Sequence, residues 1–159
     1  MVAPVSKNNS RSEPAGLLVV GYGNTLRRDD GVGILVAEAV AALNLAGVEV
    51  ITRHQLVPEL VEPLSLARAV VFVDADAQAR GDVQLRLIEP ADGAQILAHA
   101  TDPRSLLALS GQLFGFSPKA WSLGIPADDF GFGDGLSPRA EAGREAALEA
   151  IRKLARELI

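Results

Sequence analysis

Apolar and polar residues alternate along the chain in blocks that predict strands and helices in turn. Residues 17–20 (LLVV) form a short, wholly apolar run, which is typical of a strand buried in the middle of a sheet. The run at 69–73 (AVVFV) has the same character, whereas 83–87 (VQLRL) alternates and predicts a more exposed edge strand. Two further strands are expected at 48–51 and 119–124.

Four helices are expected between these strands. Apolar positions recur with helical spacing over 32–43, and a short helix at 58–67 has to bend or break at Pro63, which lacks a backbone N–H. The dipeptides Asp-Pro at the start of 102–115 and Ser-Pro at the start of 137–158 each join a capping side chain to proline at the first helical position.

The order of strands and helices indicates parallel pairing with right-handed crossovers. It predicts an α/β fold, a three-layer sandwich in which a mostly parallel sheet of about five strands is flanked by helices. Residues 1–15 are expected to be a flexible N-terminal tail and 16–159 a single domain. In such sheets ligands bind beyond the carboxyl ends of the strands, so the segments after each strand are the place to seek chemistry.

Composition excludes several classes of protein. A net charge of −5 argues against nucleic acid as a partner, and no apolar stretch approaches the roughly 18–20 residues of a membrane span. The chain has no cysteine, so disulfides, thiolate metal sites and a cysteine nucleophile are excluded. We expect a cytoplasmic protein with no membrane partner, and a monomer by default.

Acidic and imidazole side chains follow the predicted strands. They are Asp29 and Asp30 after the first strand, His54 after the second, Asp74 and Asp76 after the third, and His99 before the third helix. The first two lie in GYGNTLRRDDGVG at 21–33. This stretch is a poor phosphate cradle, because Leu26 replaces the third glycine of a dinucleotide fingerprint and the carboxylates would repel a pyrophosphate.

Each of these residues also has a plain structural interpretation. Asp29 or Asp30 could cap the following helix, Asp74 could begin a solvated loop, and His99 could be an exposed imidazole. Together, two carboxylates and a neutral imidazole form an oxygen, oxygen, nitrogen set that suits zinc or nickel, and the same groups could perform acid–base chemistry. The residues alone leave open a metal-dependent hydrolase and a metal-binding domain.

Four motifs in this order resemble the hydrogenase maturation proteases, the endopeptidases that trim the C-terminal extension of the large subunit of nickel–iron hydrogenases. They are GYGNTLRRDDGVG at 21–33, FVDA at 72–75, a histidine before the third helix and GLSP at 135–138. The segment HQLVPEL at 54–60 is similar to a subset of that family. The resemblance extends from about residue 17 to the end of the chain.

The resemblance implies a metal-contacting trio of Asp30, Asp74 and His99, with Asp30 and Asp74 as the catalytic pair. Asp29 is then expected to be a capping or solvated acid. His54 stands where relatives carry glycine or threonine, and could be an extra ligand. The resemblance further implies that nickel is supplied by the hydrogenase precursor rather than firmly bound, and leaves open whether the metal or an aspartate activates the attacking water.

The expected activity is therefore that of a peptidase whose partner is the hydrogenase large-subunit precursor. Two alternatives remain. One is a non-enzymatic nickel-handling or chaperone-like module that uses the same trio for binding only. The other is a nucleotide-binding α/β domain with a degenerate fingerprint.

Overall fold

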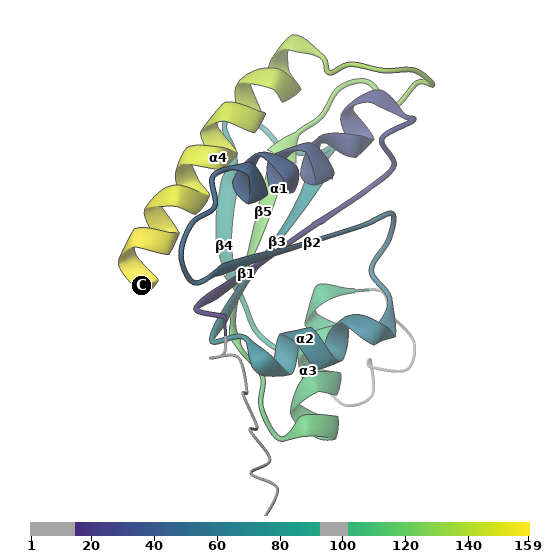
Figure 1. Ribbon diagram of the computed structural model, residues 1–159. Coiled ribbons are helices and arrows are strands. Elements are labelled where there is room, and N and C mark those ends of the chain that lie inside the picture. Colours follow the sequence, from purple (N-terminus) through teal and green to yellow (C-terminus); the bar gives the residue numbers. More distant parts are fainter. Residues whose placement is uncertain (1–14, 93–101) are drawn as a thin grey trace, which may run out of the picture.

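The computed structural model of the protein describes residues 15–92 and 102–159, and this part of the chain forms three layers (Figure 1). The strands are β1 (Leu17–Tyr22), β2 (Val48–Arg53), β3 (Ala69–Asp76), β4 (Gln84–Ile88) and β5 (Lys119–Pro126). The α-helices are α1 (Val32–Ala42), α2 (Val61–Leu66), α3 (Pro103–Phe114) and α4 (Pro138–Leu158), with 3-10 turns η1 (Arg28–Gly31) and η2 (Pro58–Leu60). The predicted fold class is confirmed.

The strands form one sheet in the order β2-β1-β3-β5-β4. All neighbouring pairs are parallel except β4 with β5, which is antiparallel. The prediction that 17–20 and 69–73 are central, adjacent and parallel is therefore confirmed, as is the edge position of β4. Each side chain from 17 to 20 is at most 1% exposed, because strands covered on both faces bury every residue.

Helices cover both faces of the sheet, with α1 and α4 on one face and α2 and α3 on the other (Figure 1). Successive residues of a strand point to opposite faces, so the two cores share each strand. In β3, for example, Val71 and Val73 belong to the α1/α4 core, while Val70 and Phe72 belong to the α2/α3 core. The same alternation directs Asp74 and Asp76 to the α2/α3 face.

Capping side chains fix the beginnings of α3 and α4 as the sequence predicts. The Asp102 carboxylate accepts the N–H of Arg104, and the Ser137 hydroxyl accepts the N–H of Ala140. α3 ends at Gly115 in the left-handed conformation, with φ 71°. In each case the cap satisfies backbone groups that the helix itself leaves without partners.

The segment at 58–67 is interrupted, which is one of the two predicted outcomes, but the interruption lies before Pro63 and not at it. The segment divides into η2 and α2, so that Pro63 stands in the first turn of α2. Backbone N–H groups in a first turn have no partner within the helix, and proline is tolerated there for that reason.

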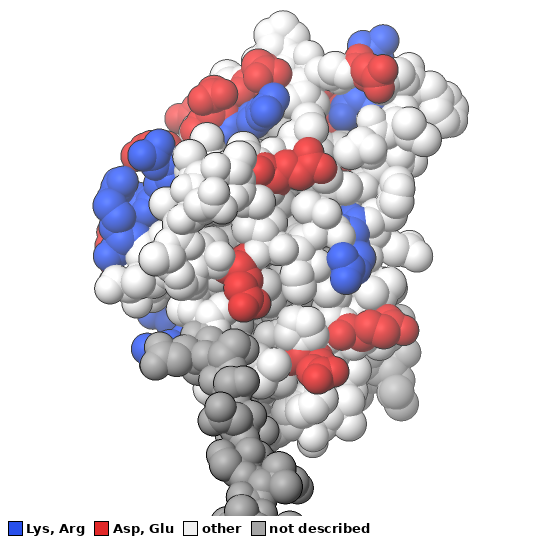
Figure 2. Space-filling view, in the orientation of Figure 1, with Lys and Arg blue, Asp and Glu red and all other residues white. Residues whose placement is uncertain are grey.

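The outward face of α4 carries interspersed acidic and basic side chains (Figure 2). Arg144 pairs with Glu141 and Arg156 with Glu149. The inward face of α4 carries Ala147, which packs in the core, and the outward face carries the charged side chains. α4 is therefore an amphipathic surface helix. Among the helices of the described residues, none has the length and hydrophobicity to cross a bilayer.

Candidate active site at the carboxyl edge of the sheet

A glycine allows the turn that leaves β1. Gly23 has a φ of 139°, and a Cβ built on it would lie 2.0 Å from the carbonyl oxygen of Asp30. Both features exclude a side chain at this position. The expectation that Gly23 adopts positive φ or lies close to a neighbour is confirmed on both counts. The close approach places the backbone of Asp30 directly against the turn.

Gly23→Val is expected to lower the free energy of unfolding by about 3 kcal/mol or more, because backbone strain and a clash with rigid backbone add together. Urea denaturation measures the change. Gly81→Val is the matched control, since Gly81 also has positive φ (90°) but a Cβ at that position would have no atom within 4 Å. Equal losses in the two variants would show that the contact with Asp30 contributes nothing.

The Asp30 carboxylate is held by the turn that it follows. Its Oδ2 accepts the N–H of Asn24 at 2.9 Å, and the Asn24 Oδ1 in turn accepts the N–H of Leu26 at 2.9 Å. The backbone N–H groups of residues 27–30 each donate to a backbone carbonyl, as does that of Gly23. A phosphate cradle needs free N–H donors at this point, so the geometry of the turn argues against the nucleotide-binding alternative.

Close packing of α1 on the ends of β1 and β3 brings Asp30 to Asp74. A Cβ on Gly33, in the first turn of α1, would lie 2.3 Å from the carbonyl oxygen of Val73 and 2.9 Å from that of Tyr22. The turn η1, which carries Asp30, packs directly against β3. Asp30 and Asp74 are therefore neighbours, although they come from separate segments of the chain.

The surroundings of Asp74 favour its protonated form. The pKa of this carboxyl is raised from 3.8 to about 6: burial is the largest cause and the charge of Asp30 also raises the pKa, while the hydrogen bond from the Ala75 N–H lowers it. That N–H donates to Asp74 Oδ1 at 2.8 Å. A carboxyl that titrates near neutral pH beside a second carboxylate is typical of a functional site.

Tyr22 is part of this cluster, although no sequence motif identified it as a site residue. Burial, followed by the charge of Asp74, raises the pKa of the Tyr22 phenol, so the hydroxyl remains a proton donor beside that carboxylate. A signal was present in the sequence, because Leu18, Val20 and Tyr22 alternate along β1 and therefore share the face that Asp74 occupies.

Asp29 is not a capping or solvated acid, and that prediction is wrong. It is 0% exposed, and the residue before α1 is Gly31, with no side-chain cap. The Asp29 carboxylate accepts the backbone N–H groups of Asp128, Asp129 and Ser137 and the Ser137 hydroxyl, at 2.6–3.0 Å. Burial alone would raise its pKa, but these hydrogen bonds outweigh burial and lower it. Asp29 thus ties the segment between β5 and α4 to the opening turn.

Among the other candidate residues within the described part of the chain, Asp76 alone adds a charge that raises the pKa of Asp74. His54 is exposed on the loop after β2, and Asp76 lies at the end of β3 with its carboxylate against Gly124 of β5. His99 lies outside the described residues; three positions later, Asp102 begins α3 and its charge contributes to the raised pKa of Tyr22. Over 15–92 and 102–159, no three acidic or histidine side chains are grouped closely enough to hold a metal ion.

The fold is similar to those of solved hydrogenase maturation enzymes. The hydrogenase maturating endopeptidase HybD from E. coli superposes with a TM-score of 0.70 and 22% identity over 89% of this chain and 92% of that one. The [NiFe] hydrogenase maturation protease HybD from Thermococcus kodakarensis superposes with a TM-score of 0.67 and 24% identity over 87% of this chain and 98% of that one. The [NiFe] hydrogenase maturation protease HycI from the same organism also gives a TM-score of 0.67, with 23% identity over 91% of this chain and 95% of that one. No protein-family model matches the chain, and no curated protein matches it either. These likenesses show that the chain has the fold of the maturation endopeptidases over almost its whole length.

Proposed function

We propose that this protein is an endopeptidase that removes the C-terminal extension of a nickel–iron hydrogenase large-subunit precursor after nickel has been inserted. The observation that carries the proposal is the pairing of Asp30 with Asp74 at the carboxyl edge of the sheet, where the charge of one raises the pKa of the other. The pair lies on a fold shared with proteins that are themselves named as hydrogenase maturation endopeptidases.

In this proposal nickel arrives as part of the substrate. Three ligands of types that nickel accepts come from carboxylate oxygens of Asp30 and Asp74 and an imidazole nitrogen of His99. The other coordination positions of the metal are left for ligands from the precursor. The Tyr22 hydroxyl orients the Asp74 carboxylate. Because the pKa of Asp74 is about 6, this group is mainly ionised above that pH and can then serve as a ligand or a base.

The test is incubation of the protein with a nickel-loaded large-subunit precursor, followed by mass spectrometry. The expected result is a released C-terminal peptide and a shortened large subunit, with the nickel-free precursor left intact. Binding of the nickel-loaded precursor without cleavage would instead identify a nickel-handling or chaperone-like module.

Asp30→Asn is expected to reduce precursor cleavage by about a hundredfold or more, because an amide is a poorer metal ligand and cannot accept a proton. The fold should persist, since the amide oxygen can still accept the Asn24 N–H. Released peptide is measured by mass spectrometry and folding by thermal denaturation. Asp134→Asn, an exposed acid before α4, is the matched control and should cleave normally. Equal activity of the two variants would remove Asp30 from the catalytic pair.

A further inference from the structure

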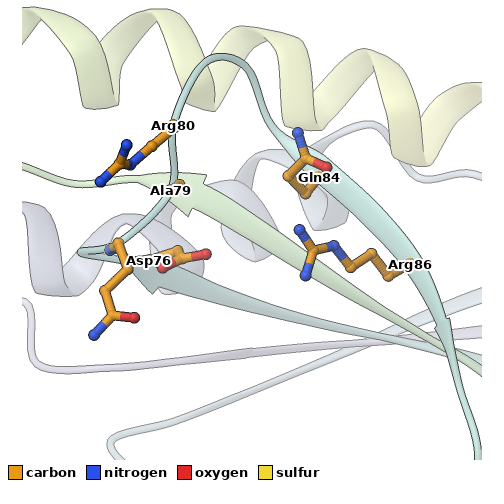
Figure 3. A pocket seen from close by; sticks show the side chains of 6 residues that line it. Asp76, Ala79, Arg80, Gln84 and Arg86 are labelled. Carbon is orange, nitrogen blue, oxygen red and sulfur yellow. Dashed lines mark hydrogen bonds between the residues drawn. The ribbon is translucent and has the colours of Figure 1, made fainter.

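We propose that a pocket beside the carboxyl end of β3 binds a carboxylate of the substrate peptide, an assignment that rests on the proposed function. The pocket has a volume of about 360 Å³ (Figure 3). Its lining residues are Asp76, Gln78, Ala79, Arg80, Gln84 and Arg86. We call it the Arg80–Arg86 pocket.

A glycine on β5 makes room for the Asp76 carboxylate, which lines this pocket. Gly124 pairs with Asp74 of β3 on one side and with Gln84 of β4 on the other. A Cβ on Gly124 would lie 3.2–3.3 Å from the Asp76 side chain, so even alanine would crowd that carboxylate. Next along the same face is Ser122, which pairs with Arg86. A larger side chain at position 124 of β5 would therefore displace the Asp76 carboxylate, which lines the pocket.

The charges of the pocket favour an anion. Arg80 and Arg86 are both exposed, and within the described residues neither forms an ion pair. Other arginines do pair with acids at 3.0–3.6 Å, namely Arg28, Arg139, Arg144 and Arg156. Figure 3 shows the Arg86 side chain reaching from β4 toward the side of the pocket where Asp76 lies. A guanidinium binds a carboxylate through two parallel hydrogen bonds, and the Gln84 amide adds a further donor.

The one acid of the pocket selects for a peptide over a simple anion. Asp76 Oδ1 accepts the Gln78 N–H at 2.9 Å, and the rest of its carboxylate can accept hydrogen bonds from a ligand. Acetate brings no such donor and is repelled by Asp76. An extended peptide brings backbone N–H groups together with its carboxylate, so it satisfies Asp76 and the arginines at once.

The position of the pocket relates the carboxylate to the scissile bond. Asp74 and Asp76 lie on the same face of β3, and Arg86 lies two strands away, on β4. Two strand spacings are about 10 Å, which an extended peptide spans with about three residues. The pocket is thus a specificity site for an acidic residue, or for the chain terminus, about three residues from the bond that is cut.

The first test is binding of acetyl-capped, C-amidated glycine pentapeptides with two aspartates or two asparagines, followed by NMR of the isotope-labelled full chain. The aspartate peptide is expected to shift the backbone amides of Arg80, Gln84 and Arg86, and the asparagine peptide is not. Arg86→Gln should weaken binding about tenfold, as expected for the loss of a charge-assisted contact. Arg152→Gln is the matched control, because Arg152 is an exposed arginine lining a different hollow beside α4.

Further probes distinguish the source of the carboxylate. An uncapped-carboxyl glycine pentapeptide that binds as well as the aspartate peptide identifies the chain terminus as the ligand; binding by the aspartate peptide alone identifies a side chain. Acetate or inorganic phosphate binding as tightly as either peptide would overturn the assignment to a peptide. Absence of shifts at the pocket, or equal weakening by Arg152→Gln, would overturn the pocket itself.

Cleavage assays distinguish a failure of the proposed pocket from a failure of the proposed function. With a nickel-loaded precursor, Arg86→Gln is expected to raise KM and leave kcat nearly unchanged, because the pocket binds substrate away from the reacting atoms. A wild-type protein that binds the aspartate peptide in the pocket but cuts no precursor would contradict the proposed function alone. A wild-type protein that cuts the precursor with no KM change on Arg86→Gln would contradict the pocket alone.

Discussion

Asp29→Asn is expected to lower the free energy of unfolding by about 2–4 kcal/mol at neutral pH, because buried donors lose a charged acceptor. Four hydrogen bonds converge on this carboxylate, all from residues on the segment between β5 and α4. Asparagine offers one acceptor oxygen and places an NH₂ group against N–H and O–H donors. Urea denaturation of the variant and of the wild type measures the difference.

The loss should also depend on pH with a defined sign. Hydrogen bonds lower the pKa of Asp29 in the folded protein, so its stabilisation is fully present above the unfolded pKa of about 4 and disappears as the pH falls through the lower folded value. The wild type and Asp29→Asn should therefore differ most near neutral pH and converge in acid. Asp134→Asn is the control, with an expected change within about 0.5 kcal/mol. A comparably small change in Asp29→Asn would contradict the structural role of this acid.

The sequence predicted the elements whose signals are local. The caps at Asp102 and Ser137 act on N–H groups two or three residues away, and the apolar strands need only a covered sheet. Asp29 could not be interpreted in the same way, since its partners lie 99 to 108 positions further along the chain. Within a short window, a buried acid that anchors a distant loop is indistinguishable from a cap.

The candidate site was predictable in part for the same reason. Parallel pairing places Asp30 and Asp74 at one edge, and motifs identified both residues. Whether β3 stays extended beyond Val73 could not be inferred, because its continuation to Asp76 depends on pairing with β5 as far as Pro126. That extension puts Asp74 and Asp76 on one face and creates the Arg80–Arg86 pocket, which no local pattern predicted. His99 stays a prediction from the resemblance.

Asp74→Asn is expected to abolish precursor cleavage and, at the same time, to stabilise the protein by about 1–2 kcal/mol above pH 6. Burial, together with the charge of Asp30, raises the pKa of Asp74 from 3.8 to about 6, which means that the folded protein holds this proton more tightly than the unfolded chain does. Stability therefore falls as the pH rises from 3.8 to about 6, because the folded state has to accommodate a buried negative charge beside Asp30. Asparagine carries no charge, and its side-chain oxygen can still accept the Ala75 N–H.

Thermal and urea denaturation across this pH range check the prediction, alongside cleavage measured by mass spectrometry. The stabilisation by Asp74→Asn should appear above about pH 6 and vanish below about pH 4. Asp29→Asn should show the opposite sign, with a loss of stability that is greatest at neutral pH, so each variant serves as the other's control. If the Asp74→Asn variant were less stable than the wild type above pH 6, favourable contacts of the ionised carboxylate would outweigh the cost of burying its charge. A variant that still cleaved would remove Asp74 from the chemistry, because a neutral amide beside Asp30 can neither take a proton nor bind nickel as a carboxylate does.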